Sequence, residues 1–554
     1  MGLFAALDQA AGNKRNGVLI AACLSGLSQT LLLVLFNEAA AAPQQAGVQR
    51  FVLFLLGLLL YVLCTRRTYD LGVEIVEALA HGLRRRIVAR IEQVELEDLE
   101  ALGTAEIFEQ LTGSTAAIAN AADDVAYFLQ TAFTLVFATL YLLWLSPAAL
   151  GIVAFLFGVA LGLYRLRLVA IRGRIQKLAR LRSSFVARLS DLLTGFKEVL
   201  LNRRRAQDLH QDLWMASDAV RQQAQGTAAH FFDNQLHAYV AGFAVLAAIG
   251  FVIPRHVDLS RSTLAQLVCC ALYFRGVANG VAVGFPAYVH SQHALTAILD
   301  LEKRLVAAAS SSSLSDEDSW HGRLVRLSAR DLAYQYRGDA EDGGFRVGPI
   351  SLEVAAGEIV FLVGPNGSGK STILKLLSGL YVPSAGTLAV DEVPVSSRNR
   401  ATYRQMISAV FSDFHLFTKL YGHTQASPEV VLPLLARLGL DQKTSFAEGG
   451  FTRRDLSTGQ RKRLALVVAL LEDRPLYVFD EWAADQDPEF RRYFYLELLP
   501  TLKQRGKAVL AVTHDDRYFS CADRVVRMQA GRVLGGQEPN HAQAVGADPS
   551  AQRG

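Results

Sequence analysis

A long charge-free run is the feature that most limits how this chain can fold. Residues 125–164 contain no Asp, Glu, Lys or Arg. As one helix they would reach about 60 Å, about twice the thickness of the hydrocarbon core of a bilayer. The run is therefore predicted to cross a membrane twice. Ser146 and Pro147 lie near its middle, and because proline ends a preceding helix, the turn between the two crossings is predicted there.

Four further apolar runs bring the predicted crossings to six: residues 17–37, 51–65, 234–254 and 262–290. The 554-residue chain is 51% hydrophobic and 19% charged, below the roughly 25% of soluble domains, so membrane lipid is an expected partner. Its net charge is only +4, and no nucleic-acid partner is predicted. The 5 cysteines form no C-x-x-C pair, which argues against a disulfide framework or a zinc site.

Basic residues set the predicted orientation. Segments 66–124 and 165–233 carry 6 and 13 Lys and Arg, whereas segment 38–50 carries 1 and segment 255–261 carries 2. Because short loops rich in Lys and Arg stay in the cytoplasm, both termini of this multi-pass chain are predicted to be cytoplasmic.

The composition changes after the last predicted crossing. Residues 306–322 are rich in Ser, Asp and Glu, as expected of an exposed linker. Short apolar strands then alternate with helices over residues 323–534, which indicates an α/β domain. Residues 535–554 lack apolar periodicity, and a disordered tail is expected. The predicted fold class is an α-helical six-span membrane domain, residues 1–305, followed by this α/β domain.

A phosphate-binding loop follows the strand-like segment 358–363. Glycines let backbone N–H groups close around phosphate, a helix N-terminus favours negative charge, Lys370 can reach the β- and γ-phosphates, and Ser371 can reach Mg²⁺. The second domain is therefore predicted to be a P-loop NTPase. The residues predicted to contact ATP and Mg²⁺ here are Gly364, Pro365, Asn366, Gly367, Ser368, Gly369, Lys370, Ser371 and Thr372.

Two carboxylates end a second apolar strand. Residues 476–479 are apolar and are followed by Asp480 and Glu481, as expected where a buried parallel strand presents acids at its carboxyl end. Asp480 suits Mg²⁺, and Glu481 would then polarise the attacking water.

Further motifs resemble those of the ATP-binding cassette (ABC) family, in the order and spacing of that family. Segment 456–461, LSTGQR, looks like its signature motif, and His514 looks like its switch histidine. The resemblance implies an exporter half-transporter that uses ATP and Mg²⁺, sits in a bacterial inner membrane, and pairs with a second copy of itself. It also implies nucleotide contacts from Tyr336, Ser457, Thr458, Gly459, Gln460 and Asp487, with Glu481 and His514 catalytic.

Departures from the usual family pattern narrow the resemblance. Ser412 stands where the family has a glutamine, so Asp413 is predicted either to be an outlying Mg²⁺ ligand or to cap the loop that follows it. Thr458 replaces a glycine, and segment 482–488 is altered as well. Together with segment 195–206, these variants resemble the bacterial cyclic-peptide exporters, the group of the pyoverdine-precursor and syringomycin transporters. The resemblance implies a peptide-type cargo, such as a cyclic or modified peptide, a siderophore precursor or a toxin.

Other charged residues are predicted to contact the ATPase domain or to line the path of the cargo. Segment 103–114 matches by position the first coupling helix of the family, so Glu106 and Glu109, or Arg203 to Arg205 near the second, are candidates for docking on the ATPase domain. Arg275 interrupts an uncharged run, and a guanidinium facing lipid is costly, so Arg275 and its i+4 neighbour Asn279 are predicted to line the translocation cavity. The alternative is an Arg275 satisfied by helix carbonyls or by Gln130.

Three functions fit these observations. The first is ATP-driven peptide export by alternating access. A lipid or lipopeptide flippase keeps the same ATPase chemistry and changes the cargo. A regulatory ATPase or ATP-gated pathway would bind ATP without pumping, but Glu481 and His514 favour turnover.

Overall fold

The computed structural model describes residues 2–41, 47–120, 122–256, 260–309, 324–336, 345–423 and 425–537. Within these ranges, the side chains of residues 105, 122–123, 160–161, 163–172, 234–235, 238, 278–279, 281–287 and 535–537 are not described. The chain divides into two compact units. We call residues 1–89 and 105–304 the helical unit, and residues 90–104 and 305–554 the α/β unit.

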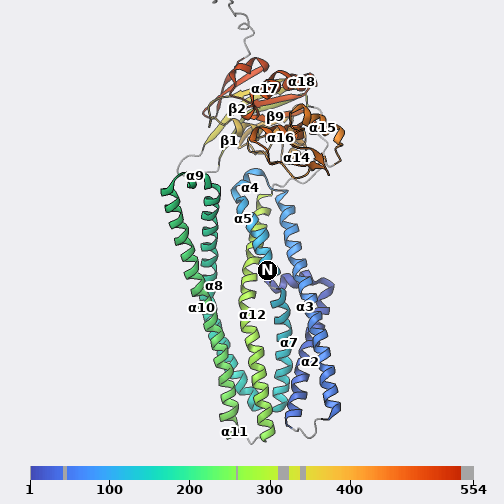
Figure 1. Cartoon of the computed structure of the whole chain (residues 1–554), viewed down its shortest axis with the longest axis vertical. Helices are drawn as coiled ribbons and strands as arrows, with labels where there is room; N and C mark the ends of the chain where they lie inside the picture. Colours follow the sequence, from blue (N-terminus) through green and yellow to red (C-terminus); the bar gives the residue numbers. More distant parts are fainter. Residues whose placement is uncertain are drawn as a thin grey trace, which may run out of the picture. The chain divides into compact units, whose positions relative to one another are not determined.

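Long helices build the helical unit (Figure 1). The turn predicted at Ser146 and Pro147 is confirmed, because Ser146 caps α8 by accepting a hydrogen bond from the Ala149 N–H at 3.3 Å and Pro147 fills the first helical position. Asn202 caps α10 in the same way. The main helices are α1 Leu3–Ala11, α2 Arg15–Ala41, α3 Val48–Ile91, α5 Thr104–Glu109, α6 Thr115–Ala119, α7 Ala122–Leu145, α8 Pro147–Thr194, α9 Phe196–Leu201, α10 Arg203–Ala247, α11 Ile253–His256 and α12 Arg261–Ala308, with π-helical segments η3 Gln110–Ser114 and η4 Ala248–Val252 and a 3₁₀ turn η1 Gly12–Lys14.

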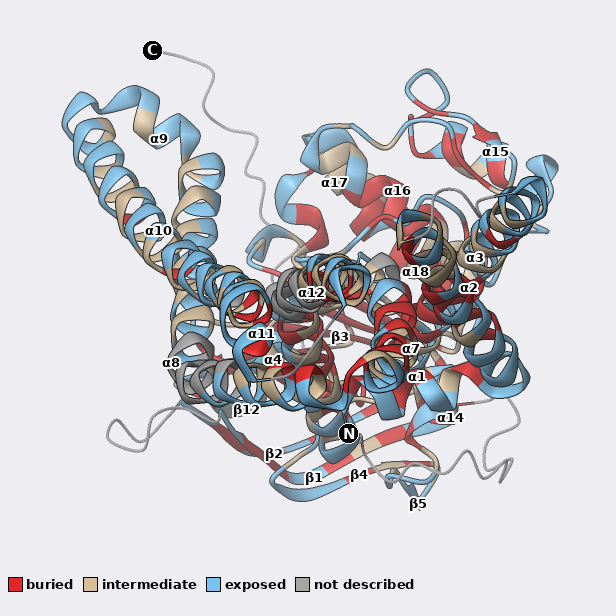
Figure 2. Ribbon diagram, turned by 90° about the horizontal axis from the view of Figure 1, so that it is seen from below, coloured by how far each residue is buried: buried red, intermediate tan, exposed pale blue. Residues whose placement is uncertain are grey.

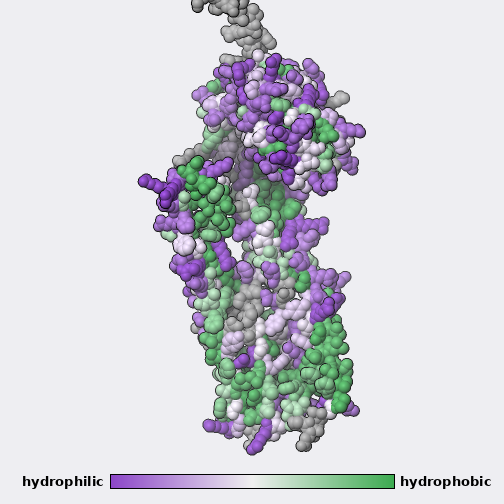
Figure 3. All heavy atoms as spheres, viewed as in Figure 1, coloured by the Kyte–Doolittle hydropathy of each residue, from purple (hydrophilic) through white to green (hydrophobic). Residues whose placement is uncertain are grey.

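Four helical stretches of the described chain are long and apolar enough to cross a membrane: Leu3–Ala41, Val48–Ile91, Glu106–Leu145 and Tyr239–His256. A shorter apolar stretch, Pro147–Val159, begins α8. The sixth predicted crossing falls inside the continuous helix α12. Hydrophobic residues gather along these helices, whereas the surface of the α/β unit is largely hydrophilic (Figure 3). The chain is therefore a multi-pass membrane protein.

The α/β unit contains a mostly parallel sheet and an antiparallel sheet. Strand order in the larger sheet is β12-β11-β3-β10-β9-β6, and in the smaller one β2-β1-β4-β5. The strands are β1 Arg326–Gln335, β2 Arg346–Ala355, β3 Ile359–Val363, β4 Ala385–Val390, β5 Val393–Pro394, β6 Ile407–Val410, β7 Phe446–Ala447, β8 Gly450–Phe451, β9 Leu476–Asp480, β10 Ala508–Val512, β11 Arg524–Gln529 and β12 Arg532–Gln537. The helices are α4 Leu96–Leu102, α13 Lys370–Leu377, α14 Arg400–Arg404, α15 Pro428–Arg437, α16 Thr458–Glu472, α17 Pro488–Tyr493 and α18 Leu499–Gln504, with the shorter turns η5 Trp482–Asp485, η6 Phe494–Leu498 and η7 Asp516–Cys521.

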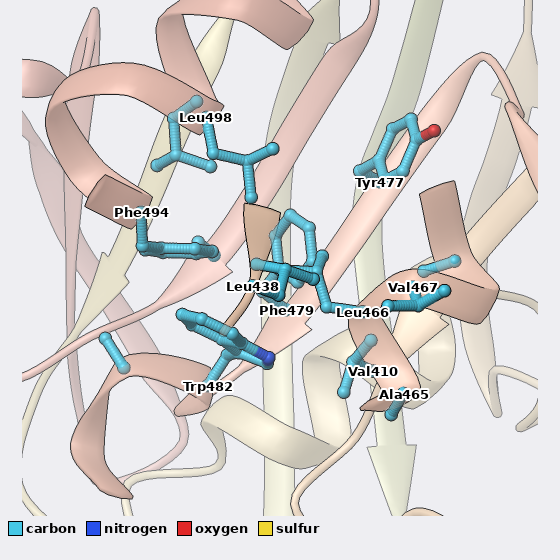
Figure 4. Packing of buried hydrophobic residues seen from close by; sticks show 14 of the residues in the cluster. Val410, Leu438, Ala465, Leu466, Val467, Tyr477, Phe479, Trp482, Phe494 and Leu498 are labelled. Atoms are coloured by element: carbon cyan, nitrogen blue, oxygen red, sulfur yellow. The ribbon is translucent and has the colours of Figure 1, made fainter. Parts of the chain in front are cut away.

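Strand alternation divides the core of this unit into two hydrophobic layers. Phe361 of β3 packs in one layer with Phe479 and Trp482, whereas its neighbours Val360 and Leu362 pack in the other. Figure 4 shows the first layer. Strands β3, β9 and β10 are buried on both faces, as parallel strands covered by helices must be (Figure 2). Their carboxyl ends therefore meet at one rigid edge, where the site residues lie.

Candidate functional site

The phosphate-binding loop connects β3 to the N-terminus of α13. Gly364, Gly367 and Gly369 have φ values of 155°, 77° and 96°, which disfavour any side chain. A Cβ on Gly364 would lie 2.3 Å from the Met528 carbonyl oxygen, and one on Gly369 would lie 2.9 Å from Cγ2 of Val347. The loop therefore needs its glycines to keep this shape.

Lys370 and Ser368 fit an anion inside this loop. The Lys370 ammonium donates to the carbonyl oxygens of Gly364 at 2.9 Å and Pro365 at 3.0 Å, and its burial lowers its pKa, against the opposing effect of Glu481 and Asp480. The Ser368 hydroxyl is buried and has no hydrogen-bond partner within the described chain. A phosphate would supply the missing acceptor and a counter-charge, so this loop fits the nucleotide that the sequence predicts.

Three oxygen-bearing side chains meet at the end of β9. The Ser371 hydroxyl donates to Asp480 Oδ1 at 3.3 Å, and the Ser412 hydroxyl donates to Asp480 Oδ2 at 3.1 Å. Asp480 is only 2% exposed. Hard oxygen donors of this kind are what Mg²⁺ prefers. Asp413 is exposed, and within the described residues no hydrogen bond or ion pair joins it to this cluster.

Glu481 and His514 face each other across neighbouring parallel strands. The Nε2 atom of His514 lies 3.0 Å from Oε1 of Glu481, and the Glu481 N–H donates to the Val512 carbonyl oxygen at 3.2 Å. Glu481 has a φ of 50°, a backbone conformation that residues other than glycine rarely adopt. This backbone turn presents the carboxylate beyond the end of the strand, next to Asp480.

Tyr336 lies beside the phosphate loop. Its hydroxyl is 2.9 Å from that of Thr372, and its ring meets Tyr334 edge-on at 5.0 Å. Tyr336 is 37% exposed, which leaves area for an adenine to stack on its ring.

The signature segment begins α16. Ser457 accepts a hydrogen bond from the Gln460 N–H at 3.4 Å while Gln460 accepts one from the Ser457 N–H at 3.2 Å, which is a capping box. Ser457 and Thr458 are exposed, and within the described chain no hydrogen bond joins them to its phosphate loop. A Cβ on Gly459 would lie 2.5 Å from the Asp485 carbonyl oxygen, so this glycine lets the two segments touch. Asp487 caps α17 through the Phe490 N–H at 3.0 Å.

Lys462, which sequence reasoning missed, ties the signature helix to Glu481. Its buried ammonium donates to the Glu481 carbonyl oxygen at 2.8 Å and pairs with Asp485 Oδ2 at 2.7 Å. The indole N–H of Trp482 donates back to the Lys462 carbonyl oxygen at 2.9 Å. The signal in the sequence was a lysine on an apolar helix combined with an aspartate in the altered segment 482–488.

An acidic segment that precedes Glu106 in the chain belongs to the α/β unit. Glu95, which precedes α4, pairs with Arg400 at 3.1 Å and also with Arg404. Glu100 accepts hydrogen bonds from Lys375 at 3.2 Å and from the Tyr381 hydroxyl at 2.7 Å, and burial, followed by this bond to Glu100, raises the pKa of Tyr381. Segment 90–104, part of the predicted cytoplasmic segment 66–124, is therefore held on the α/β unit by these side chains.

The predicted docking of Glu106 and Glu109 stays a prediction. Glu106 pairs with Arg304 at 2.6 Å inside the helical unit, and Glu109 is exposed. The contacts of Glu95 and Glu100 with Arg400, Arg404 and Lys375 add a second acidic segment that the sequence analysis did not single out. Arg203 to Arg205 are exposed at the start of α10, and their docking stays a prediction.

Arg275 packs on α10. Its guanidinium lies 4.8 Å from the ring centroid of Phe243, and a Cβ on Gly242 would lie 2.5 Å from Cγ of Arg275. Gln130, the alternative partner, instead donates to the Thr65 hydroxyl at 3.3 Å. Arg275 is not among the lining residues of a polar cavity bounded by α2, α3, α7 and α12, and its place in a translocation cavity stays a prediction. The Asn279 side chain lies outside the described residues.

Comparisons with known proteins agree with this geometry. Residues 347–484 match the family model described as ABC transporter. The chain is 31% identical over 547 residues to the ATP-binding protein SyrD of Pseudomonas syringae pv. syringae, covering 93% of each chain. It is 28% identical to the ATP-dependent lipid A-core flippase of Paraburkholderia xenovorans (strain LB400), covering 53% of this chain and 54% of that one.

A solved structure shows the same fold. The structure of a bacterial Atm1-family ABC exporter with ATP bound superposes with a TM-score of 0.76 at 17% sequence identity, covering 95% of each chain.

Proposed function

Since this chain belongs to the ABC transporter family and has the fold of its exporters, we propose that it exports a peptide-type cargo across a bacterial inner membrane by alternating access, as a homodimer. The chain is an ATP-hydrolysing enzyme with its membrane helices and its ATPase fused. In this proposal both termini are cytoplasmic, and the helical unit opens alternately to each side of the membrane.

The Glu481–His514 pair carries the proposal that the chain pumps. Glu481 orients the attacking water and accepts its proton, and His514, 3.0 Å away, holds the carboxylate in place. Lys370 binds the phosphate oxygens at the loop. When bound by Ser371 and Asp480, Mg²⁺ neutralises charge on those oxygens. A chain that only gated a pathway would need no such water-orienting pair, which disfavours the regulatory alternative.

Motif departures support a peptide-type cargo. Ser412, Thr458 and segment 482–488 resemble the bacterial cyclic-peptide exporters, and the relative matched over 93% of the chain is similar through both units. A lipid flippase is the second candidate, because several relatives matched over about half of the chain are named lipid A-core flippases.

Transport assays test this proposal. Proteoliposomes with the ATPase units facing outward should accumulate a radiolabelled uncharged cyclic peptide only when ATP and Mg²⁺ are present, and the Glu481→Gln variant should not. Peptide uptake equal to that of the variant, with ATP-dependent movement of labelled lipid A in the same vesicles, would reject the peptide cargo in favour of the flippase.

A further inference from the structure

A polar cavity of about 370 Å³ lies within the helical unit. Four helices that run side by side supply its lining, namely α2, α3, α7 and α12 (Figure 1). Its volume falls within the range of about 300–1,000 Å³ found for small-molecule sites. The lining residues are Gln29, Tyr61, Thr65, Tyr69, Tyr127, Gln130, Thr131, Thr134, Leu272, Tyr273, Gly276 and Val277.

Hydrogen bonds hold one wall of this cavity in place. The Thr134 hydroxyl donates to Gln29 Oε1 at 3.0 Å, which joins α7 to α2, and Gln130 donates to Thr65 at 3.3 Å, which joins α7 to α3. Helices α2 and α7 are in close contact at Gly26, where a Cβ would lie 2.7 Å from the Thr134 backbone nitrogen. The wall is therefore preformed, which lowers the entropic cost of binding a ligand there.

Helix-to-helix hydrogen bonding explains only part of this polarity. Polar side chains often join membrane helices, and Gln29, Thr65 and Thr134 do so here. The hydroxyl of Tyr273 is buried, yet no group of the described chain bonds to it. A buried hydroxyl without a partner is costly, and a ligand in the cavity would supply that partner.

The chemistry of the lining selects against charge. Among its described residues there is no Asp, Glu, Lys, Arg or His, whereas there are 4 tyrosines, 2 glutamines and 3 threonines. A charged ligand group would lose its hydration without gaining a counter-ion. Amide and hydroxyl groups can bond to glutamine and threonine, and apolar side chains can pack on tyrosine rings.

We propose that this cavity binds an uncharged part of the peptide cargo, a few residues whose backbone amides and hydroxyls bond to Tyr273, Gln130 and Thr131. The proposal rests on the peptide-export function above. It excludes lipid A as the occupant, because the phosphates of that lipid would need cationic partners that the described lining lacks.

Binding of a matched peptide set tests the proposal. The probes are an uncharged cyclic peptide of Leu, Phe, Ser and Gly, two analogues in which one Ser is replaced by Asp or by Lys, and lipid A. Dissociation constants and the stimulation of ATPase activity are measured with the full chain in nanodiscs. The uncharged peptide should bind at least about tenfold more tightly than either analogue, which corresponds to one unpaired buried group.

Matched substitutions locate the binding. Tyr273→Phe and Thr131→Val should each weaken binding of the uncharged peptide about tenfold while leaving ATP binding and basal hydrolysis unchanged. Thr139→Val makes the same chemical change as Thr131→Val on α7 outside the lining, and it should have no effect on peptide binding. Gln130→Glu should reverse the preference and favour the Lys analogue over the uncharged peptide.

The outcomes separate the inference from the function it rests on. Binding of the uncharged peptide that is weakened equally by cavity and control variants would overturn the cavity assignment and leave peptide export standing. Stimulation by lipid A with no binding of any peptide would overturn both. Equal binding of the charged analogues would overturn the selection against charge.

Discussion

At Glu481, replacing one oxygen with nitrogen should separate ATP binding from ATP hydrolysis. The Glu481→Gln side chain keeps its size and can still bond to His514, but it cannot accept a proton from water. We expect hydrolysis to fall by about 10² to 10⁴ while the affinity for ATP stays the same. Initial rates of phosphate release and equilibrium binding of a fluorescent ATP analogue measure the two effects.

Glu489→Gln serves as the control, since Glu489 is an exposed acid a few residues along the chain. It should hydrolyse ATP like the unmodified chain. A Glu481→Gln variant within a few-fold of that rate would show that another group orients the water.

Substitution of Ser412 and substitution of Asp413 should have different effects on the affinity for Mg²⁺. Because the Ser412 hydroxyl bonds to Asp480 at 3.1 Å, Ser412→Ala should weaken Mg²⁺ binding to the ATP-bound chain, by about 10- to 100-fold as for other partners of metal ligands. Asp413→Ala should leave it unchanged, since Asp413 is exposed. Calorimetric titration with Mg²⁺ at saturating ATP gives both affinities, and the reverse order would restore Asp413 as the ligand.

The sequence identified which segments carry the chemistry but not which side chain of each makes the contact. The phosphate loop, Asp480, Glu481 and His514 follow from residue type and spacing, because those spacings are local. Ser412 and Asp413 are neighbours, and only the path of the loop after β6 decides that it is the Ser412 hydroxyl that bonds to Asp480. Lys462 was missed for the same reason, since its partners lie on a different segment.

At the scale of elements, the ion pair between Lys462 of α16 and Asp485 of η5 should respond differently to the loss of each partner: removing one should destabilise the chain more than removing the other. The side chain of Lys462 is 5% exposed and that of Asp485 is 46% exposed. Asp485→Ala therefore leaves a buried ammonium that still donates to the Glu481 carbonyl oxygen but has lost its counter-charge, whereas Lys462→Met leaves a carboxylate that water can reach. We expect Asp485→Ala to destabilise the chain by about 1–3 kcal/mol and Lys462→Met by less.

Chemical unfolding, followed by the fluorescence of the buried Trp482, measures both free energies. The double variant should be more stable than Asp485→Ala alone, because it removes the buried charge as well. If the changes in the free energy of unfolding of the two single variants add up to that of the double variant, the two side chains do not stabilise each other.

The acidic segment at α4 should couple cargo to hydrolysis. Glu95 and Arg400 have side chains only 10% and 11% exposed, and breaking one partner of such a buried pair costs about 3–5 kcal/mol. We expect Glu95→Gln to loosen segment 90–104 and reduce cargo-stimulated hydrolysis several-fold, with basal hydrolysis retained. Glu109→Gln, an exposed acid outside this segment, should stimulate normally. Unchanged stimulation in Glu95→Gln would argue against coupling through Glu95.

One turn in the membrane-spanning part was predictable because the bilayer fixes the length of a crossing, whereas the far ends of the long helices were not, since the predicted crossing 51–65 lies inside α3 Val48–Ile91. The turn at Ser146 follows from the length of the charge-free run and from one proline. No comparable length constraint predicts which residues of segment 90–104 contact the rest of the α/β unit. The run from Glu95 to Glu100 is acidic and meets Arg400, Arg404 and Lys375, but charge complementarity between segments some 300 residues apart is visible only once the chain is folded.

For the whole molecule, the exposed signature segment bears on the proposed pairing with a second copy. Ser457 and Thr458 are exposed at the start of α16, and within the described chain no hydrogen bond joins them to the phosphate loop of the same chain. A helix N-terminus of this kind can bind phosphate. In a two-fold homodimer, each signature segment would face the phosphate loop of the other chain, and both sites would be equivalent.

Mixing two inactive variants tests this arrangement. Lys370→Ala removes the phosphate-binding ammonium, and Ser457→Arg blocks the signature segment with a bulky side chain, so each variant alone should lose hydrolysis. In a mixed dimer one site carries both defects and the other carries neither, so co-expression should restore about a quarter of the normal rate if the two sites act independently. Phosphate release from the co-expressed and the separately prepared chains measures the gain. If each site were built within one chain, every site would contain one defect, and the mixture would hydrolyse no faster than the mean of its components.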